Sequence, residues 1–316
     1  MTMTSEKKQT PMILGLFVLL VSACGTDEIG LTDTAMDSDA EWAVDTVVDP
    51  FVDTGADTAP DYIAETMPDT APDLAPDLPP DLTPDPVTDP GAFDGVPGEF
   101  TQTWSGRSYR MYVPGAYSHA TPIPVVVGFH GAGDSGSNFY MVSKAYGWSA
   151  AADAGPFILI VPDTKSPYSD FAVWSGDPMN DIDEMGVEMG EIIDLISDVG
   201  VHYNVDYGSL YAYGFSDGGL FLGVAGMQYS NDYAGLVIAG YGWGSGYAYT
   251  PTRLIPVYMI CGTSDPFYSY AEQTQAYLAS RGHPLEWVPV SGVAHSFSGL
   301  MSYRSPTTIY GWLAGH

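Results

Sequence analysis

The segment that most restricts the fold is residues 209–219, SLYAYGFSDGG. It begins as an aromatic-rich apolar run, typical of a buried strand, and ends in Gly-Phe-Ser-Asp-Gly, which fits the pattern G-x-S-x-G. That pattern predicts a tight strand-to-helix turn with the side chain of Ser216 exposed above a sheet. Gly214 and Gly218 are needed there because the turn brings backbone segments so close that a Cβ would clash. Apolar residues follow at helical spacing, so we interpret Ser216 as a candidate nucleophile. The alternative is an ordinary glycine-rich turn, since the chain has 36 glycines.

The N-terminus has the features of an export signal. Lys7 and Lys8 precede an uncharged apolar run at residues 12–23, which ends in Val-Ser-Ala before Cys24. The run has the length of a signal-peptide core and is too short for a membrane-spanning helix, which needs about 20 residues. The small residues before Cys24 resemble a bacterial lipobox, and this resemblance implies cleavage after residue 23 and lipidation of Cys24. The alternative is a plain secretory signal cleaved at Ala23.

Residues 24–97 predict a disordered spacer. An acidic residue occupies every fourth position from Asp33 to Asp89, prolines recur through the segment, and it contains no Lys or Arg. Prolines break helices, and mutual repulsion of the acids, with few large apolar residues, prevents a core. We expect an extended chain, rich in polyproline II, that holds a domain away from a membrane. Binding of cations or of a basic partner is the alternative, although no glycine-bearing calcium loop accompanies the acids.

The charge of the chain limits its partners. The formal net charge is −30, and from residue 99 onward 19 acidic residues stand against seven basic ones, a balance of −12. An acidic domain repels phosphate backbones, so we predict no nucleic-acid partner. Anionic polymers are disfavoured for the same reason, which leaves neutral polymers and small neutral molecules.

Cysteine usage excludes a disulfide within the predicted domain. The chain has two cysteines, and Cys24 is the predicted lipidation site at the start of the spacer. Cys261 ends an apolar run at 255–260, so we expect it to be buried as a small hydrophobic side chain.

Residues 98–316 predict one α/β domain. Continuous apolar runs such as 124–129 are typical of parallel strands buried on both faces, and 183–203 carries apolar residues at helical spacing. The alternation of strands and helices predicts a mostly parallel sheet with helices on both faces, with the site at the carboxyl ends of the strands. We expect strands at 107–113, 124–129, 156–161, 210–215, 235–239, 254–260 and 285–290. We expect helices at 138–152, 183–203, 268–279 and 307–313, and one directly after Ser216.

The loop after the predicted strand 124–129 is a candidate oxyanion hole. It reads His-Gly-Ala-Gly from His130, and its glycines allow the backbone to approach a substrate. Acyl transfer at a serine needs backbone N–H donors aimed at the developing oxyanion. We assign one donor to Asp217, the residue after the nucleophile, and the other to Ala132, with Gly131 as the near alternative. A glycine-rich turn with His130 merely packed is the other interpretation.

Two further strand ends carry the remaining catalytic candidates. Asp265 follows the strand 254–260, where a carboxylate can orient a histidine; the alternative is that it only caps the next helix. His295 follows the strand 285–290 on a loop of small residues and is the one histidine that fits the order Ser, Asp, His. A packed structural histidine is the alternative.

Together these motifs resemble the α/β-hydrolase superfamily, and within it the group of polyhydroxybutyrate depolymerases and feruloyl or acetyl-xylan esterases. The segments that carry the resemblance are VVVGFHGAG at 125–133, VD at 205–206 before 210–219, GTSD at 262–265 and GVAH at 292–295. The resemblance implies that Ser216 is the nucleophile, His295 the general base and acid, and Asp265 the residue that orients His295. It also implies backbone donors at Ala132 and Asp217, no metal and no cofactor.

Two loops are rich in aromatic residues and are candidates for substrate contact. The loop 164–183 contains Trp174, and the loop 240–250 contains Tyr241 and Trp243. Exposed rings there would stack on a sugar or a feruloyl group. The alternative is that they pack on top of the sheet. Tyr168, Phe171, Tyr247 and Tyr249 belong to the same two loops.

These observations lead us to expect an exported serine esterase. It would be monomeric and would hydrolyse carboxylic esters, either feruloyl or acetyl groups on a neutral polysaccharide or short polyhydroxyalkanoates. It would be lipid-anchored through Cys24 at the outer membrane or cell surface, or secreted. The alternatives are a serine peptidase of the same fold and a non-catalytic surface binding protein.

Overall fold

The computed structural model describes residues 95–165, 174, 182–243 and 251–316. The predicted signal peptide, the lipidation site Cys24 and the spacer up to residue 94 lie outside the described residues. Among the described residues, no helix is both long and apolar enough to cross a membrane.

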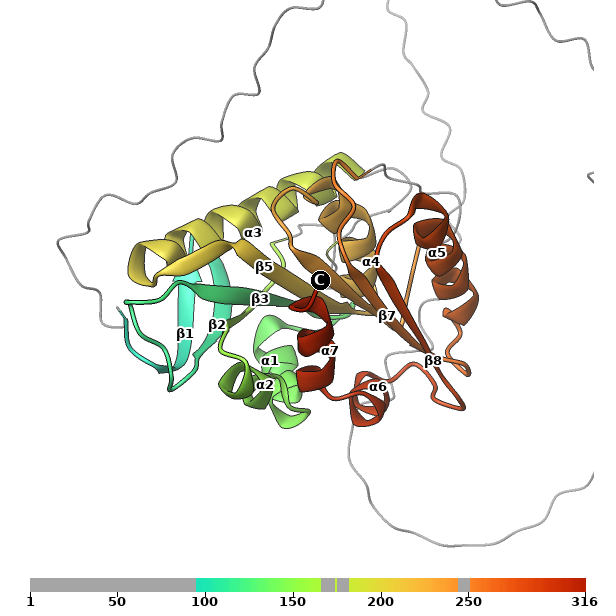
Figure 1. Ribbon diagram of the computed structural model, residues 1–316, viewed down its shortest axis with the longest axis horizontal. Helices are drawn as coiled ribbons and strands as arrows, with labels where there is room; N and C mark the ends of the chain where they lie inside the picture. The colour runs from blue at the N-terminus through green and yellow to red at the C-terminus, as the bar shows by residue number, and fades with distance from the viewer. Residues whose placement is uncertain (1–94, 166–173, 175–181, 244–250) are drawn as a thin grey trace, which may run out of the picture. The chain divides into compact units, whose positions relative to one another are not determined.

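A twisted sheet runs through the described domain (Figure 1). Its strand order is β1-β2-β4-β3-β5-β6-β7-β8, with β1 and β2 antiparallel to their neighbours and the other strands parallel. The strands are β1 (Gly98–Trp104), β2 (Arg107–Val113), β3 (Ile123–Phe129), β4 (Ile158–Pro162), β5 (Val205–Phe215), β6 (Gly235–Ala239), β7 (Val257–Gly262) and β8 (Leu285–Val290).

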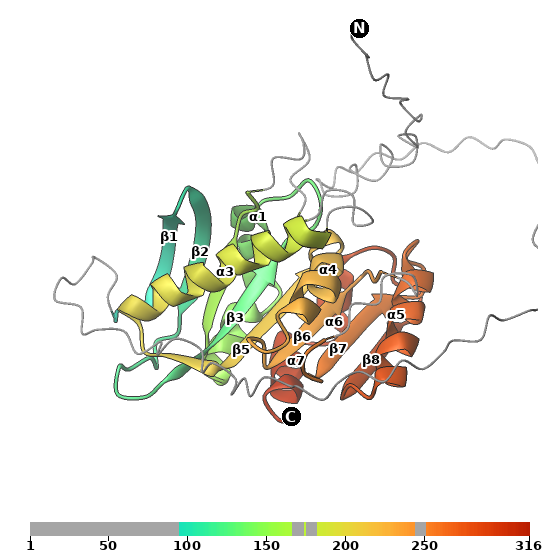
Figure 2. The same cartoon turned by 90° about the horizontal axis from the view of Figure 1, so that it is seen from above.

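Helices cover both faces of this sheet (Figures 1 and 2). On one face lie α3 (Ile182–His202), α4 (Asp217–Phe221), the π-helical turn Leu222–Gly226 and α5 (Tyr268–Arg281). On the other face lie α1 (Gly136–Ala145), α2 (Trp148–Ala154), α6 (Phe297–Tyr303) and α7 (Pro306–Leu313). The predicted mostly parallel sheet with helices on both faces is therefore confirmed.

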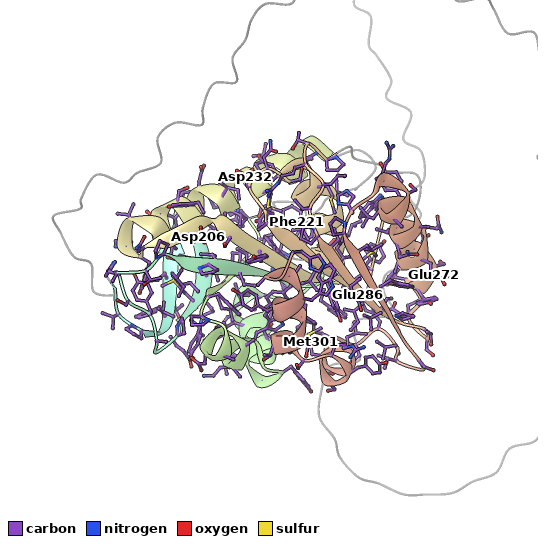
Figure 3. The ribbon with its side chains drawn as sticks, in the orientation of Figure 1. Asp206, Phe221, Asp232, Glu272, Glu286 and Met301 are labelled. Atoms are coloured by element: carbon purple, nitrogen blue, oxygen red, sulfur yellow. The ribbon has the colours of Figure 1, made fainter. Side chains whose placement is uncertain are left out.

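The core consists of two hydrophobic clusters, one on each face of the sheet. Strand β3 contributes to both, because Val125 and Val127 point to the α3 face while Val126 points to the α1 face. Figure 3 shows Phe221 on the first face and Met301 on the second, and both are buried. Burial on both faces explains why these strands are continuous apolar runs rather than alternating ones.

A network around a buried guanidinium ties β2 to α3 and to the loop after β4. The guanidinium of Arg107 is fully buried and donates to Glu188 at 2.6 Å, to Glu191 at 2.8 Å and to the carbonyl of Asp163 at 2.6 Å. Removing one partner of such a group leaves an uncompensated buried charge, which is strongly destabilising. The carboxylate of Asp163 in turn accepts the backbone N–H of Gly136 at the start of α1. The network therefore fixes the segment that follows the candidate oxyanion loop.

The sequence patterns located most elements, with three differences. The predicted helix 138–152 is two helices, because the chain turns between them at Gly147, where φ is +106°. Strand β1 was not predicted; it is an edge strand whose burial alternates residue by residue, with no continuous apolar run. Helix α6 was also not predicted. It is short and begins at a capping residue, Ser296, whose hydroxyl accepts the N–H of Gly299 at 3.1 Å.

Candidate active site

Ser216 lies on a strained turn between β5 and α4. Its φ of 56° and ψ of −120° are rarely adopted by residues with a side chain, and the surrounding structure must maintain them. Its backbone N–H donates to the carbonyl of Ala239 on β6 at 3.0 Å, which holds the turn against the sheet. A Cβ on Gly214 would lie 2.2 Å from the carbonyl oxygen of Gly218, and a Cβ on Gly218 would lie 2.2 Å from that of Phe129. The predicted steric need for both glycines is therefore confirmed.

The loops after β7 and β8 are hydrogen-bonded to each other, which brings their side chains together. The N–H of Ser264 donates to the carbonyl of Val293 at 3.0 Å, and the N–H of Gly292 donates to the hydroxyl of Thr263 at 2.9 Å. These bonds join the two parallel strands beyond their ends. As a result Asp265 and His295, thirty residues apart in the chain, are held side by side.

Ser216, His295 and Asp265 form a continuous series of hydrogen bonds. The distance from Ser216 Oγ to His295 Nε2 is 2.8 Å, and that from His295 Nδ1 to Asp265 Oδ2 is also 2.8 Å. Because a carboxylate only accepts, the proton between them is on Nδ1, which leaves the lone pair of Nε2 facing the serine hydroxyl. The side chain of Asp265 is fully buried and that of His295 is 19% exposed. The imidazole of His295 thus faces the serine hydroxyl as a base, and the buried carboxylate of Asp265 accepts the proton on the other side of the ring.

Asp265 also binds the backbone at the start of the next helix, the role that the alternative interpretation gave it. Its second oxygen, Oδ1, accepts the N–H of Phe267 at 2.9 Å, just before α5 begins. One carboxylate therefore fixes the start of α5 with one oxygen and contacts His295 with the other. The two interpretations of Asp265 are compatible, and the local bond restricts rotation of the carboxylate.

Two phenylalanines enclose the ring of His295, and the sequence patterns did not single them out. The ring of Phe215 stacks on the imidazole with centroids 4.7 Å apart, and the edge contact of Phe267 has centroids 5.1 Å apart. Phe215 occupies the first variable position of G-x-S-x-G. Its position directly before the serine could have indicated a contact with the catalytic histidine. Phe267 follows Asp265 by two residues. These contacts limit rotation of the imidazole.

The loop after β3 lies directly against Ser216. A Cβ on Gly131 would be 3.3 Å from the Cβ of Ser216, so this part of the backbone is in contact with the nucleophile. Ala132 is exposed, and among the described residues no group accepts a hydrogen bond from its N–H. Asp217 is the first residue of α4 and follows the nucleophile directly, so its N–H lies in the first turn of that helix. The positions suit both predicted donors, and Gly131 stays open as the alternative to Ala132.

His130 is a buried structural residue. It has no exposed surface, and its Nδ1 bonds to the carbonyl of Gly131 at 2.9 Å. Burial lowers the pKa of His130, so its imidazole is neutral at ordinary pH. The interpretation that the His130 side chain is merely packed therefore fits the structure. The backbone of the loop that follows His130 still lies next to Ser216.

Cys261 is buried at the end of β7, as predicted. Burial, with the nearby charge of Asp265, raises the pKa of its thiol to about 12. The thiolate is therefore not accessible at neutral pH, and the thiol takes no part in the chemistry described above.

The three candidate substrate contacts are not equivalent. Trp174 is 2% exposed and Trp243 is 4% exposed, so both indoles belong to the core and the expectation that their rings are exposed to substrate is corrected. Trp174 fills space against α4, and Trp243 occupies the space above Gly223. Tyr241 is half-buried and packs edge-on against Phe267, with centroids 4.5 Å apart. The other aromatic residues named for these loops, Tyr168, Phe171, Tyr247 and Tyr249, lie outside the described residues.

Within the described part of the chain, no group of three or more His, Cys, Asp or Glu side chains is arranged to hold a metal ion.

Comparison with known proteins identifies the fold. No family model matches the chain and no curated protein matches its sequence. A thermostable esterase superposes with a TM-score of 0.51 at 19% identity, over 69% of this chain and 62% of its own length. A fluorophosphonate-binding serine hydrolase of Staphylococcus aureus gives 0.52 at 12% identity, over 70% and 98%. An acetyl xylan esterase from Aspergillus awamori gives 0.50 at 14% identity, over 69% and 100%. The chain has the α/β-hydrolase fold, as the motifs predicted.

The packing around Gly218 gives a direct test of the turn. We expect Gly218→Ala to lower the free energy of unfolding by about 1–3 kcal/mol or more, because the new Cβ must displace the carbonyls of Phe129 and His130. Gly311→Ala is the matched control, since a Cβ there meets no atom within 4 Å and Ala is favoured inside α7. Urea denaturation of both variants measures the difference. Equal stability of the two would contradict the close contact described here.

Proposed function

We propose that this protein is a serine esterase that cleaves carboxylic esters by two-step acyl transfer. The observation that carries the proposal is the series of hydrogen bonds from Asp265 through His295 to Ser216, with the serine on a strained turn at the carboxyl end of β5. The three structural neighbours named above, described as esterases or serine hydrolases, support the same class of reaction.

The first half of the reaction forms an acyl-enzyme. Ser216 Oγ attacks the ester carbonyl while His295 Nε2 takes the hydroxyl proton, and the electron pair of the C=O bond moves onto oxygen. When the tetrahedral intermediate collapses, the bond to the alcohol oxygen breaks and His295 returns its proton to that oxygen. The alcohol leaves, and the acyl group stays on Ser216. Asp265 holds Nδ1 throughout and stabilises the imidazolium.

The second half releases the acid. A water molecule takes the place of the alcohol, His295 Nε2 removes its proton, and the hydroxide attacks the acyl carbonyl. Collapse of the second intermediate returns the proton to Ser216 Oγ and frees the carboxylic acid. The N–H groups of Asp217 and Ala132 would donate to the oxyanion in both halves, a contribution of about 10²–10³-fold in kcat for each donor.

The surroundings of the serine are aromatic, and the domain that carries them is acidic. The half-buried ring of Phe267 contacts His295, and the half-buried ring of Tyr241 packs against Phe267. Tyr270, 46% exposed, lies next to Tyr241 and continues the same aromatic surface. The acidic balance of the domain disfavours anionic polymers. We therefore propose feruloyl or acetyl esters of neutral polysaccharides as substrates, with short polyhydroxyalkanoates as the second class. An ester is preferred over an amide because an alkoxide leaves more readily than an amine.

A panel of substrates tests the proposal. The purified protein should hydrolyse at least one of p-nitrophenyl acetate, methyl ferulate, acetylated xylan and a hydroxybutyrate oligomer, and Ser216→Ala should reduce that turnover about 10⁴-fold or more. Ser302→Ala, at an exposed serine of α6, is the matched control and should keep full activity. Faster cleavage of amides than of esters would indicate a peptidase. Folded protein with no turnover on any substrate would indicate a binding protein.

The export signal and Cys24 lead to a proposal about location. We propose that Cys24 is lipidated and attaches a monomeric protein to the outer membrane or cell surface, with the acidic segment as a tether. The lipobox-like residues before Cys24 are the support for this proposal.

Substitution of Cys24 tests the anchor. We expect Cys24→Ser to move the protein from the membrane fraction to the soluble fraction, because the chain would lose its lipid. Fractionation with intact-mass measurement follows both the location and the modification. Unchanged membrane association, or a wild-type mass without lipid, would show that the chain is simply secreted or held in another way.

A further inference from the structure

Trp174 connects the two backbone segments that flank Ser216. Its indole N–H donates to the carbonyl of His130 at 2.9 Å, and its backbone N–H donates to Oδ2 of Asp217 at 2.7 Å. His130 begins the loop after β3, and Asp217 begins α4. One residue from a third part of the chain therefore binds both segments that carry the candidate oxyanion donors.

The indole is held in a fixed orientation by its neighbours. Phe129 contacts the ring edge-to-face, with centroids 4.9 Å apart and planes at 81°, and Phe221 stacks on it, with centroids 5.3 Å apart and planes at 26°. With 2% of its surface exposed, Trp174 has no space to rotate. Its N–H therefore stays aimed at the carbonyl of His130.

This bond controls the direction of the oxyanion loop. The carbonyl of His130 and the N–H of Gly131 belong to one planar peptide, so fixing the oxygen also fixes the N–H that points the opposite way. The N–H of Ala132 belongs to the next peptide, whose carbonyl, that of Gly131, bonds to Nδ1 of His130 at 2.9 Å and accepts the N–H of Asp134 at 3.2 Å. A rotated His130–Gly131 peptide would turn the N–H of Gly131 away from the oxyanion and disturb the bonds that hold the peptide of Ala132.

The second bond fixes the carboxylate of Asp217. This carboxylate belongs to the residue whose own N–H is the other candidate donor. A negative charge free to turn toward the oxyanion would repel it, since like charges in a site of low dielectric interact strongly. The N–H of Trp174 holds that carboxylate in one position.

We infer that Trp174 is a positioning residue of the oxyanion hole, acting through His130 on one side and Asp217 on the other. The inference rests on the proposed esterase function. Its role requires no contact with substrate, which agrees with the burial of its ring.

Replacement of the indole N–H tests this role. Trp174→Phe keeps an aromatic ring against Phe129 and Phe221 and keeps the backbone N–H, but it removes the bond to His130. After normalisation to active sites by burst titration, we expect kcat to fall about 10–100-fold with little change in KM, because the lost alignment matters only in the transition state. The dissociation constant of a boronic acid inhibitor, which imitates the tetrahedral intermediate, should rise by a similar factor.

Trp148→Phe is the matched control. Trp148 is equally buried, stacks on Tyr213 on the other face of the sheet, and within the described residues its indole N–H has no partner. The same chemical change should therefore leave the normalised kcat and the inhibitor constant unchanged. If Trp174→Phe behaves like this control, its role is structural only and the inference is wrong.

A second variant covers the case in which Trp174→Phe does not fold. Asp217→Ala removes the acceptor that holds the backbone N–H of Trp174, so the indole is less firmly aimed at the carbonyl of His130, and the normalised kcat should fall with KM retained. Because the carboxylate charge is removed as well, such a fall reports lost positioning of Trp174 and not repulsion of the oxyanion. An unchanged kcat would contradict the inference for that side. A wild-type protein that neither cleaves esters nor binds the boronic acid would instead overturn the proposed function, and this inference with it.

Discussion

The close contact of the turn at Ser216 with the end of β3 is the constraint on which the site depends. The carbonyl of Phe129 lies where the Cβ of any side chain at position 218 would be. The second residue of α4 must therefore be glycine. The candidate oxyanion loop, which begins after Phe129, lies against the serine, and Ser216 has a strained conformation with φ of 56°. The strain is maintained by the sheet on both sides, through β3 and through the hydrogen bond to β6.

The remaining catalytic candidates are positioned by strand ends and not by the turn itself. The loops after β7 and β8 bond to each other, and Asp265 joins its loop to α5 with one oxygen while it contacts His295 with the other. Further from the serine, the buried Arg107 network fixes the segment between β4 and α1. The site is thus a set of short loops, each bound at its base to rigid elements, which suits a reaction that needs fixed donors.

The sequence was sufficient for those parts of the fold that depend on local pattern. Ser216 was found from its flanking glycines, and the strands β3, β6 and β8 were found from their apolar runs. Properties that depend on packing across the chain could not be found in this way. Trp174 and Tyr241 both lie in aromatic loops, yet one is buried against α4 and the other is half-exposed. The break at Gly147 was missed because one glycine within a helical pattern does not reveal its φ.

Labelling with a fluorophosphonate probe is the most direct test of the central claim that Ser216 is an activated nucleophile. The account predicts one covalent adduct per chain, located on Ser216 by peptide mass spectrometry, and a large loss of labelling rate in His295→Ala because the base that removes the hydroxyl proton is gone. Labelling at another residue, or no labelling of the folded protein, would contradict it.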